Sequence, residues 1–419
     1  MNVHLQSLGC RLNQSEVATL AHRFVAAGHA IVDDPVQADL CVVNTCAVTA
    51  EAERKSRRCV RTLARANHQA RIAVVGCYAT LAHQQCTDLP GVAWVVPNAE
   101  KERVGEMVAP DSLTPSPTPG GGGRGASPRT RAFVKAQDGC DNRCTYCIVR
   151  LLRGPARSRS LADVVAEVQA LAETGCQEAV LTGVNLGSYG RDLGISDGLH
   201  ALITNLLDHT DLPRLRLSSL EPWDLDETFF SLWENPRLCR QLHLPLQAGC
   251  DETLHRMGRR ITAAEFARLV EAARAVIPDL AVTSDVIVGF PGEDETAFRA
   301  SYDFVAAMEF ARLHVFPYSP RPGTAAARLP DRVDRAVRRA RAHTMRELGA
   351  EQALRFGQRF VGREVVVLWE QRQRDGLWTG LTDNYLRVVT HAEGDLHNQL
   401  TLTQLTAAQN GYLVGRVIE

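Results

Sequence analysis

The sequence predicts an α/β protein in three parts: an N-terminal parallel-sheet domain, a partial (β/α)6 barrel and a small C-terminal β-barrel. Short apolar runs alternate with helical patterns over most of the 419 residues, which is typical of parallel sheets covered by helices. One stretch of Pro, Gly and Ser, residues 110–128, interrupts the alternation and predicts a flexible linker. Near the C-terminus the helical patterns give way to short strand patterns with turn signals.

The first domain, residues 1–109, contains three predicted buried strands, NVHLQSLG, ADLCVVNT and RIAVVG. Helical patterns such as SEVATLAHRFVAAG separate them, and Cys10, Cys46 and Cys77 stand where the three strands end. Because the carboxyl ends of parallel strands line one crevice, we expect these three thiols to meet there. Cysteine is also a common buried residue, and this is how we interpret Cys41, Cys59, Cys86, Cys176, Cys239 and Cys250.

The second domain, residues 129–356, alternates strand and helix six times. The predicted strands are RAFVKAQ, EAVLTGV, RLRLSSLE, RQLHLPLQ, LAVTSDVIVGF and ARLHVFPYS. Six units are too few to close an eight-stranded barrel but fit an open one, with active-site loops at the carboxyl ends of the strands. The loop GCDNRCTYCIV (139–149) follows the first strand, so we expect it at the barrel mouth.

An arginine-rich helix (332–360) leads into the third domain, residues 357–419. Its runs GREVVVLWE, LWTGLTDNYLRVVT, QLTLTQLTAA and YLVGRVIE predict four short strands of a small β-barrel. Barrels of this size often bind oligonucleotides, although they can equally be inert.

Composition restricts the functional classes. A net charge of −1 neither favours nor excludes a nucleic-acid partner. Basic stretches at 53–71, 150–159 and 332–343, however, are compatible with a polyanionic partner. The start, MNVHLQSLGC, lacks the features of a signal peptide, and no run approaches eighteen apolar residues. We therefore expect a cytoplasmic protein with no membrane partner, whose twelve cysteines serve metal binding or catalysis rather than disulfides.

The central motif is Cx3CxxC, formed by Cys140, Cys144 and Cys147. Three thiolates can hold three irons of a 4Fe–4S cluster and leave the fourth iron open, as a catalytic site requires. A zinc knuckle that borrows Cys176 or a histidine is the structural alternative. The spacing resembles that of the radical S-adenosylmethionine (SAM) enzymes. This resemblance implies that SAM binds the open iron and is cleaved by one electron to methionine and a 5′-deoxyadenosyl radical.

The resemblance covers the whole chain apart from the linker. LGCRLNQSE, VVNTCAVT and VVGCYA resemble the N-terminal domain of the methylthiotransferases, which implies a second 4Fe–4S cluster on Cys10, Cys46 and Cys77. TDNYLRVV resembles their RNA-holding TRAM domain. Stretches such as RLSSLEP (216–222), with Glu221 as one marker, are most similar to the branch that modifies N6-threonylcarbamoyladenosine at position 37 of tRNA.

That branch membership implies an enzyme that adds a methylthio group to C2 of the adenine. This carbon carries no acidic proton or leaving group, so acid–base chemistry cannot reach it. One SAM would methylate a sulfur on the N-terminal cluster, and another would generate the radical. Both clusters must then face one substrate, so we expect the first domain to dock over the open side of the partial barrel. The implied partners are the tRNA anticodon stem-loop and a reducing protein such as flavodoxin or ferredoxin.

The resemblance also assigns residues to SAM and substrate. Tyr146 matches the aromatic residue near the adenine of SAM, and Gly183 and Asn185 occupy the place where relatives bind its amino group; a plain tight turn is the alternative. Glu221 would accept hydrogen bonds from the threonylcarbamoyl group, because a carboxylate is only an acceptor. The other candidates for SAM, adenine or phosphate are Ser219, Gln247, Arg157 and Arg159.

Other functions stay open at this point. The same chemistry could act on isopentenyladenosine of tRNA or on an aspartate of a ribosomal protein, although the basic helix after Cys46 fits RNA better. A non-catalytic iron–sulfur or zinc RNA-binding protein is the alternative from another class. No GxxxxGK[ST] or HExxH motif supports a different reaction.

Overall fold

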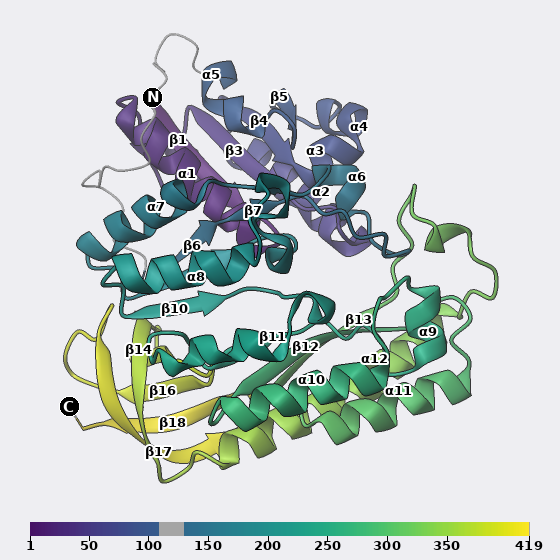
Figure 1. Ribbon diagram of the computed structural model, residues 1–419. Coiled ribbons are helices and arrows are strands. Elements are labelled where there is room, and N and C mark those ends of the chain that lie inside the picture. The colour runs from purple at the N-terminus through teal and green to yellow at the C-terminus, as the bar shows by residue number, and fades with distance from the viewer. Residues whose placement is uncertain (109–129, 419) are drawn as a thin grey trace.

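A computed structural model of the chain describes residues 1–108 and 130–418, and it contains three domains (Figure 1). The linker predicted at 110–128 lies outside the described residues. Among the described residues, no helix combines the length and apolar character that a membrane crossing requires.

The first domain is a parallel five-stranded sheet in the order β2-β1-β3-β4-β5. The three predicted strands are confirmed as β1 (Asn2–Ser7), β3 (Leu40–Thr45) and β4 (Arg71–Gly76); the edge strands β2 (Ala30–Ile31) and β5 (Val92–Pro97) were not predicted. The sheet is covered by α1 (Arg11–Ala26), α2 (Ala50–Ala66), α3 (Cys77–Leu81), α4 (His83–Thr87) and α5 (Val104–Val108).

Six parallel strands form the predicted partial barrel of the second domain. They are β6 (Arg131–Lys135), β9 (Glu178–Thr182), β10 (Arg214–Leu217), β11 (Gln241–His243), β12 (Ala281–Val288) and β13 (Arg312–Pro317). Two three-stranded sheets, β10-β9-β6 and β11-β12-β13, are joined by bridges such as Ser219 to His243. The barrel stays open between β6 and β13.

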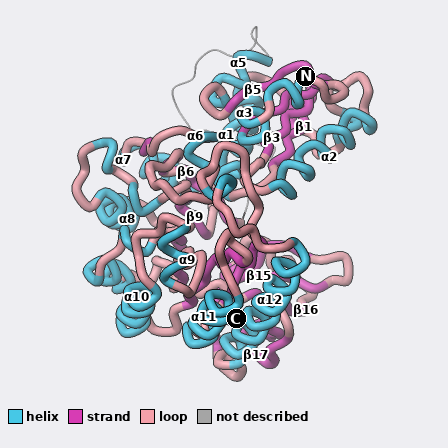
Figure 2. Tube along the Cα trace, turned by 90° about the vertical axis from the view of Figure 1, so that its right-hand side faces the viewer, coloured by secondary structure: helices cyan, strands magenta, loops and turns pink. Residues whose placement is uncertain are grey.

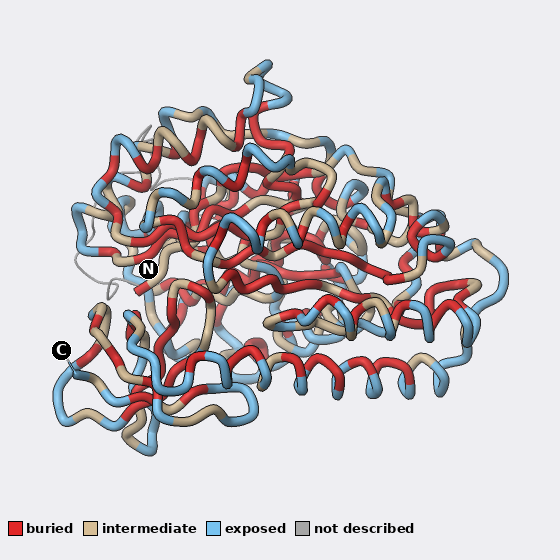
Figure 3. Tube along the Cα trace, turned by 60° about the horizontal axis from the view of Figure 1, so that its bottom comes forward, coloured by how far each residue is buried: buried red, intermediate tan, exposed pale blue. Residues whose placement is uncertain are grey.

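Helices cover the outside of this barrel, and their apolar faces form its main core with the strands. The long ones are α7 (Leu161–Glu173), α8 (Gly198–His209), α10 (Ala263–Val276) and α11 (Glu295–Met308). The short hairpin β7 (Gln137–Asp138) and β8 (Arg157–Ser158) and the short helices α6 (Val149–Arg153) and α9 (Asp251–Arg256) lie near the barrel mouth. Figure 3 shows the buried residues concentrated in the central strands.

The helix α12 (Arg335–Gln358) packs along β13 and leads into a closed barrel. Its strands are β14 (Glu364–Arg372), β15 (Leu377–Thr382), β16 (Arg387–His391), β17 (Leu400–Gln409) and β18 (Tyr412–Val417). The prediction of four strands was wrong by one. The run LWTGLTDNYLRVVT breaks at a turn in which Tyr385 has φ +67°, so it forms β15 and β16 instead of a single strand.

The first domain contacts both edges of the barrel opening. On one edge, α1 packs against β6. On the other, the start of α2 meets the loop after β13: Ala50 N–H donates to Ser319 Oγ (3.2 Å), and Arg321 donates to Glu53 (2.8 Å). Figure 2 shows the first domain on one side of the barrel and the C-terminal barrel towards the other. This is the docking expected if two clusters serve one substrate.

Candidate active site

The loop with the Cx3CxxC motif connects β7 to α6 and is held at both ends. Cys140 N–H donates to Gly154 O (3.1 Å), and Thr145 N–H donates to Met257 O (2.9 Å). Gly139 has φ +69°, and a Cβ there would lie 1.8 Å from Pro155 O, so only glycine fits. The backbone therefore fixes the loop at the barrel mouth, as expected.

The three thiols of this loop are partly buried and influence one another. Burial raises the pKa of Cys140 to about 11 and that of Cys147 to about 12. Burial also raises the pKa of Cys144, against the opposing effect of Arg259, whose Nη1 lies 3.9 Å from the Cys144 sulfur. Thiolate ligands must be deprotonated, so metal binding here releases protons and Arg259 offsets part of the cost at Cys144.

The spacing of the cysteines suits a polynuclear cluster. Among residues 1–108 and 130–418, one trio of His, Cys, Asp or Glu ligand atoms lies within 4.8 Å of one another, and it contains no cysteine. Sulfurs around a single zinc, with bonds of about 2.3 Å, would lie only about 3.8 Å apart. In an iron–sulfur cluster each thiolate binds a different iron and the sulfurs are farther apart. Neither cysteine trio therefore has the close spacing that a single zinc ion requires.

Arg259 organises the mouth of the barrel, and sequence reasoning did not single it out. Its Nη2 lies 2.7 Å from Glu221 Oε2 in an ion pair and donates to Pro245 O (2.5 Å), while its guanidinium stacks 4.3 Å from the Trp223 ring. Glu221 is thus held beside the cysteine loop by a buried cation. The nearby Tyr146 packs into the apolar cluster that contains Met257 and Phe290.

The residues predicted to bind SAM have different surroundings. The Asn185 N–H donates to Gln137 Oε1 (3.0 Å), which also lies 3.0 Å from where a Cβ on Gly183 would stand. Asn185 Oδ1 is buried without a hydrogen-bond partner among the described residues, so it is free for a ligand. Gln247, with φ +74°, follows β11 beside β12. Arg159 is bound to the side chain of Glu167 and to Lys135 O.

The second cysteine trio assembles at the carboxyl edge of the first sheet, as predicted. Burial raises the pKa of Cys10, and it raises that of Cys46 to about 11; the nearby Cys77 sulfur adds to both shifts, so the three thiols lie close together. Gly9 closes one side of the trio. It has φ +96°, and a Cβ there would lie 2.6 Å from Cys46 Cβ.

A buried polar network joins the two cysteine sites. Arg153, at the end of α6, donates to Asn13 (2.6 Å), Glu16 (3.1 Å) and Asp138 (2.8 Å). Lys101 pairs with Glu16 and lies 3.4 Å from Asp138. Residues from both domains thus neutralise each other away from water. No local pattern in the sequence indicated this network.

A single side chain links one cysteine trio to the helix that follows the other. Asn98 Nδ2 lies 3.5 Å from the Cys77 sulfur and 2.9 Å from Leu152 O in α6, the helix that starts two residues after Cys147. Ile148 and Leu152 also pack into the core of the first domain.

The turn that splits β15 from β16 reaches the other two domains. Tyr385 OH accepts from Arg11 (2.8 Å), which follows Cys10, and the Tyr385 ring lies 5.1 Å from the guanidinium of Arg216 in β10. Arg216 is fully buried and pairs with Glu178 (2.7 Å). Arg216 also donates to the carbonyls of Thr382 and Asp383.

Comparisons with known proteins agree with this architecture. Residues 2–96 match the Uncharacterized protein family UPF0004, and residues 134–305 match the Radical SAM superfamily. The chain is 35% identical over 408 residues to the threonylcarbamoyladenosine tRNA methylthiotransferase MtaB of Thermotoga maritima, covering 94% of this chain and 93% of that protein. It is also 35% identical over 393 residues to the tRNA-2-methylthio-N(6)-dimethylallyladenosine synthase of Sphingopyxis alaskensis, covering 90% and 88% of the two chains.

A solved structure shares the fold. The radical S-adenosylmethionine methyltransferase TsrM of Kitasatospora setae superimposes with a TM-score of 0.55 at 18% identity, over 76% of this chain and 74% of that one.

Proposed function

We propose that this chain, which belongs to the radical SAM methylthiotransferases of tRNA, converts N6-threonylcarbamoyladenosine at position 37 to its 2-methylthio derivative. One observation carries the proposal: Asn98 bonds both to Cys77 of one trio and to the helix that follows Cys147 of the other. Two cysteine sites held together in this way suit a reaction in which sulfur from one site meets a radical from the other.

Each site would hold a 4Fe–4S cluster: one on Cys140, Cys144 and Cys147, the other on Cys10, Cys46 and Cys77. With SAM bound, the first would supply the one-electron chemistry that attack on an unactivated C–H carbon requires. The chain itself binds and orients SAM and the substrate, and it excludes water from them. Arg259 places positive charge beside Cys144, and the apolar cluster around Tyr146 offers a flat surface to adenine.

We assign the SAM amino group to Gly183 and Asn185, because the orphaned Asn185 Oδ1 is a buried acceptor in the domain that carries the cysteine loop. Ser219 and Gln247 stay candidates for the rest of SAM. Arg159 is the weakest of the candidates, since Glu167 already neutralises it.

The C-terminal barrel is proposed to act as a TRAM-type domain that holds the anticodon stem-loop. A reducing protein such as flavodoxin or ferredoxin would deliver the electron, and the tRNA substrate places the enzyme in the cytoplasm. The dimethylallyladenosine reaction is the second candidate, because a relative with that name covers as much as 90% of this chain.

Nucleoside mass spectrometry tests the substrate. Cells that lack the gene should lose 2-methylthio-N6-threonylcarbamoyladenosine from their tRNA, and a plasmid copy should restore it, whereas a Cys144→Ala copy should not. If that nucleoside persists and the 2-methylthio isopentenyl nucleoside disappears, the substrate is wrong but the chemistry stands. If anaerobic SAM and a strong reductant release no 5′-deoxyadenosine, the protein is a binder and catalysis is refuted.

A further inference from the structure

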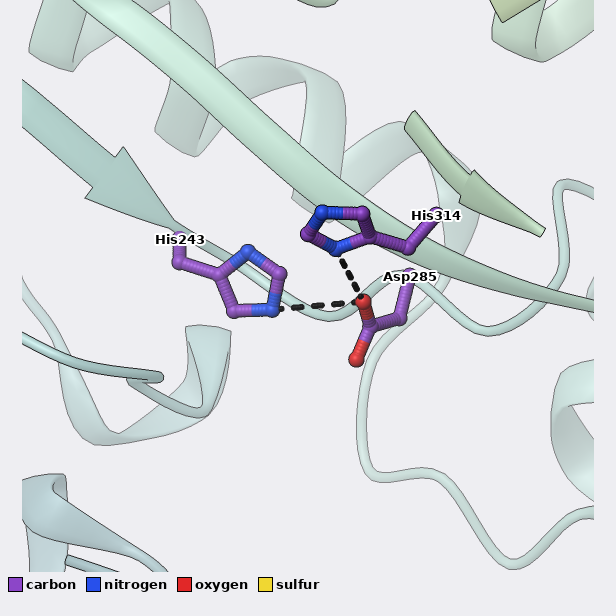
Figure 4. Close-up of side chains that lie close together, drawn as sticks. All are labelled: His243, Asp285 and His314. Atoms are coloured by element: carbon purple, nitrogen blue, oxygen red, sulfur yellow. Dashed lines mark hydrogen bonds and ion pairs between the residues drawn. The ribbon is translucent and has the colours of Figure 1, made fainter. Parts of the chain in front are cut away.

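A polar cluster lies inside the barrel, apart from both cysteine sites (Figure 4). His243 ends β11, Asp285 is in the middle of β12, and His314 lies beside Asp285 on β13. His314 Nδ1 lies 3.0 Å from Asp285 Oδ1, and His243 Nε2 lies 3.4 Å from the same oxygen. Nothing in the reaction described so far uses these three side chains.

Two atoms of the cluster are left for a ligand. His243 Nδ1 is held by Thr283 Oγ1 (2.9 Å), so both of its ring nitrogens are engaged. Among the described residues, none bonds to Asp285 Oδ2 or to His314 Nε2, and Figure 4 shows both pointing away from the cluster. Asp285 Oδ2 is an acceptor, and His314 Nε2 can donate when the ring carries both protons.

The cluster lies on the barrel face that carries the proposed SAM pocket. Side chains alternate along a strand, so Asp285 shares its face with Ile287, which packs with the cluster that includes Tyr146. Asp285 comes two residues before Ile287 on β12, so the free atoms of Asp285 and His314 lie deeper in the barrel than this apolar surface. The substituent of a tRNA adenine held at the mouth beside SAM would extend towards them.

Positive charge adjoins the cluster. Arg312 shares the face of His314, is exposed, and forms no ion pair within the described part of the chain. Arg11, beyond its bond to Tyr385 OH, has no carboxylate partner there either. Burial opposes ionisation of Tyr385, but Arg11, Arg131, Arg216 and Arg312 together lower its pKa, so all four guanidinium groups lie near this ring.

We propose that His243, Asp285, His314 and Arg312 bind the threonylcarbamoyl side chain and thereby set the choice of substrate. The inference rests on the proposed function. Asp285 Oδ2 would accept from an N–H or hydroxyl of this side chain, and Arg312 with His314 would bind its carboxylate. Glu221, which the sequence assigned to this contact, is neutralised by Arg259.

The same site discriminates against an isopentenyl group. A hydrocarbon there would desolvate the carboxylate and the cations without giving them partners, and sites built to hydrogen-bond a substrate reject analogues that cannot do so. A metal ion is the rival occupant, because the three ligand atoms lie within 4.8 Å of one another. Both histidines, however, already point to one carboxylate oxygen, so Asp285 Oδ1 has its partners without an ion.

The test is equilibrium binding of the full chain, with its clusters reconstituted, to tRNA with and without threonylcarbamoyl on adenosine 37. We expect wild type to prefer the modified tRNA. Asp285→Asn and Arg312→Gln should each reduce that preference about tenfold or more, and both should bind the unmodified tRNA as wild type does. Arg299→Gln, at an exposed arginine on α11, is the charge-matched control and should keep the preference.

Three results would overturn the proposal: a preference retained in both variants, an equal loss of affinity for both tRNAs, or a stoichiometric metal other than iron that is lost in His314→Gln. Circular dichroism and iron content establish that the variants fold. Arg312 is exposed, so Arg312→Gln should fold even if Asp285→Asn does not, and this variant alone can then test the proposal. The reaction product of wild type separately reports the proposed function: methylthiolation of isopentenyladenosine alone would refute it, whatever the variants do.

Discussion

Replacing Arg153 by methionine should uncouple the first domain from the barrel. The Arg153 side chain is 3% exposed and connects Asn13 and Glu16 of one domain to Asp138 of the other. Methionine has a similar length but no charge, so two buried carboxylates lose their shared partner.

The magnitude follows from the contacts that remain. Removing one partner of a buried ion pair typically costs about 3–5 kcal/mol. Lys101 still neutralises Glu16 and lies 3.4 Å from Asp138, so we expect the lower end, about 3 kcal/mol, for the docking of the domains. Glu16→Gln combined with Arg153→Met should cost less than the sum of the single variants, with a coupling of about 1–3 kcal/mol.

Urea unfolding followed by limited proteolysis measures this loss, because the first domain should become cleavable before the barrel unfolds. SAM cleavage should continue while methylthiolation falls, since only the second needs both sites together. Arg299→Met, at an arginine that is 70% exposed, is the control. Unchanged stability in Arg153→Met, or strict additivity with Glu16→Gln, would refute the argument that this network holds the domains together.

Three further predictions follow from single positions. Cys46→Ala should retain release of 5′-deoxyadenosine but lose the 2-methylthio product and about half of the bound iron, whereas Cys144→Ala should lose both activities; loss of cleavage in Cys46→Ala would contradict separate roles. Gly9→Ala should destabilise the first domain by about 1–3 kcal/mol and lower its iron content, because it adds a clash with Cys46 to a strained φ. The matched control is Gly28→Ala, with φ +81° and no atom within 4 Å of the added carbon, and thermal unfolding of the two should differ. Arg216→Met should lower the free energy of unfolding by about 3–5 kcal/mol, because Glu178 is then buried and unpaired. The double variant Arg216→Met with Glu178→Leu should recover part of this loss. No recovery would show that the contacts of Arg216 with the carbonyls of the C-terminal barrel dominate.

The sequence alone predicted most of the strands and helices and the positions of the two cysteine trios. Strand and helix periodicities, the Cx3CxxC spacing and the position of Cys10, Cys46 and Cys77 at strand ends are local features, and local features can be read from neighbouring residues. The errors in the predicted strands also have local causes. β2 has only two residues, both exposed, and therefore lacks an apolar signal, while the turn around Tyr385 carries neither glycine nor proline to mark it.

The tertiary structure decided which polar residues meet. Arg153 and Glu16 are 137 positions apart in sequence, and Glu221 reaches Arg259 only because the end of β10 and the segment after α9 meet at the same mouth. His243, Asp285 and His314 each lie in a short strand that contains other polar residues as well, so the sequence does not single them out. Whether such a residue faces water, a helix or the barrel interior depends on the register between strands and on how the sheet curves. These are properties of the assembled chain, because they depend on contacts between segments that no local pattern specifies.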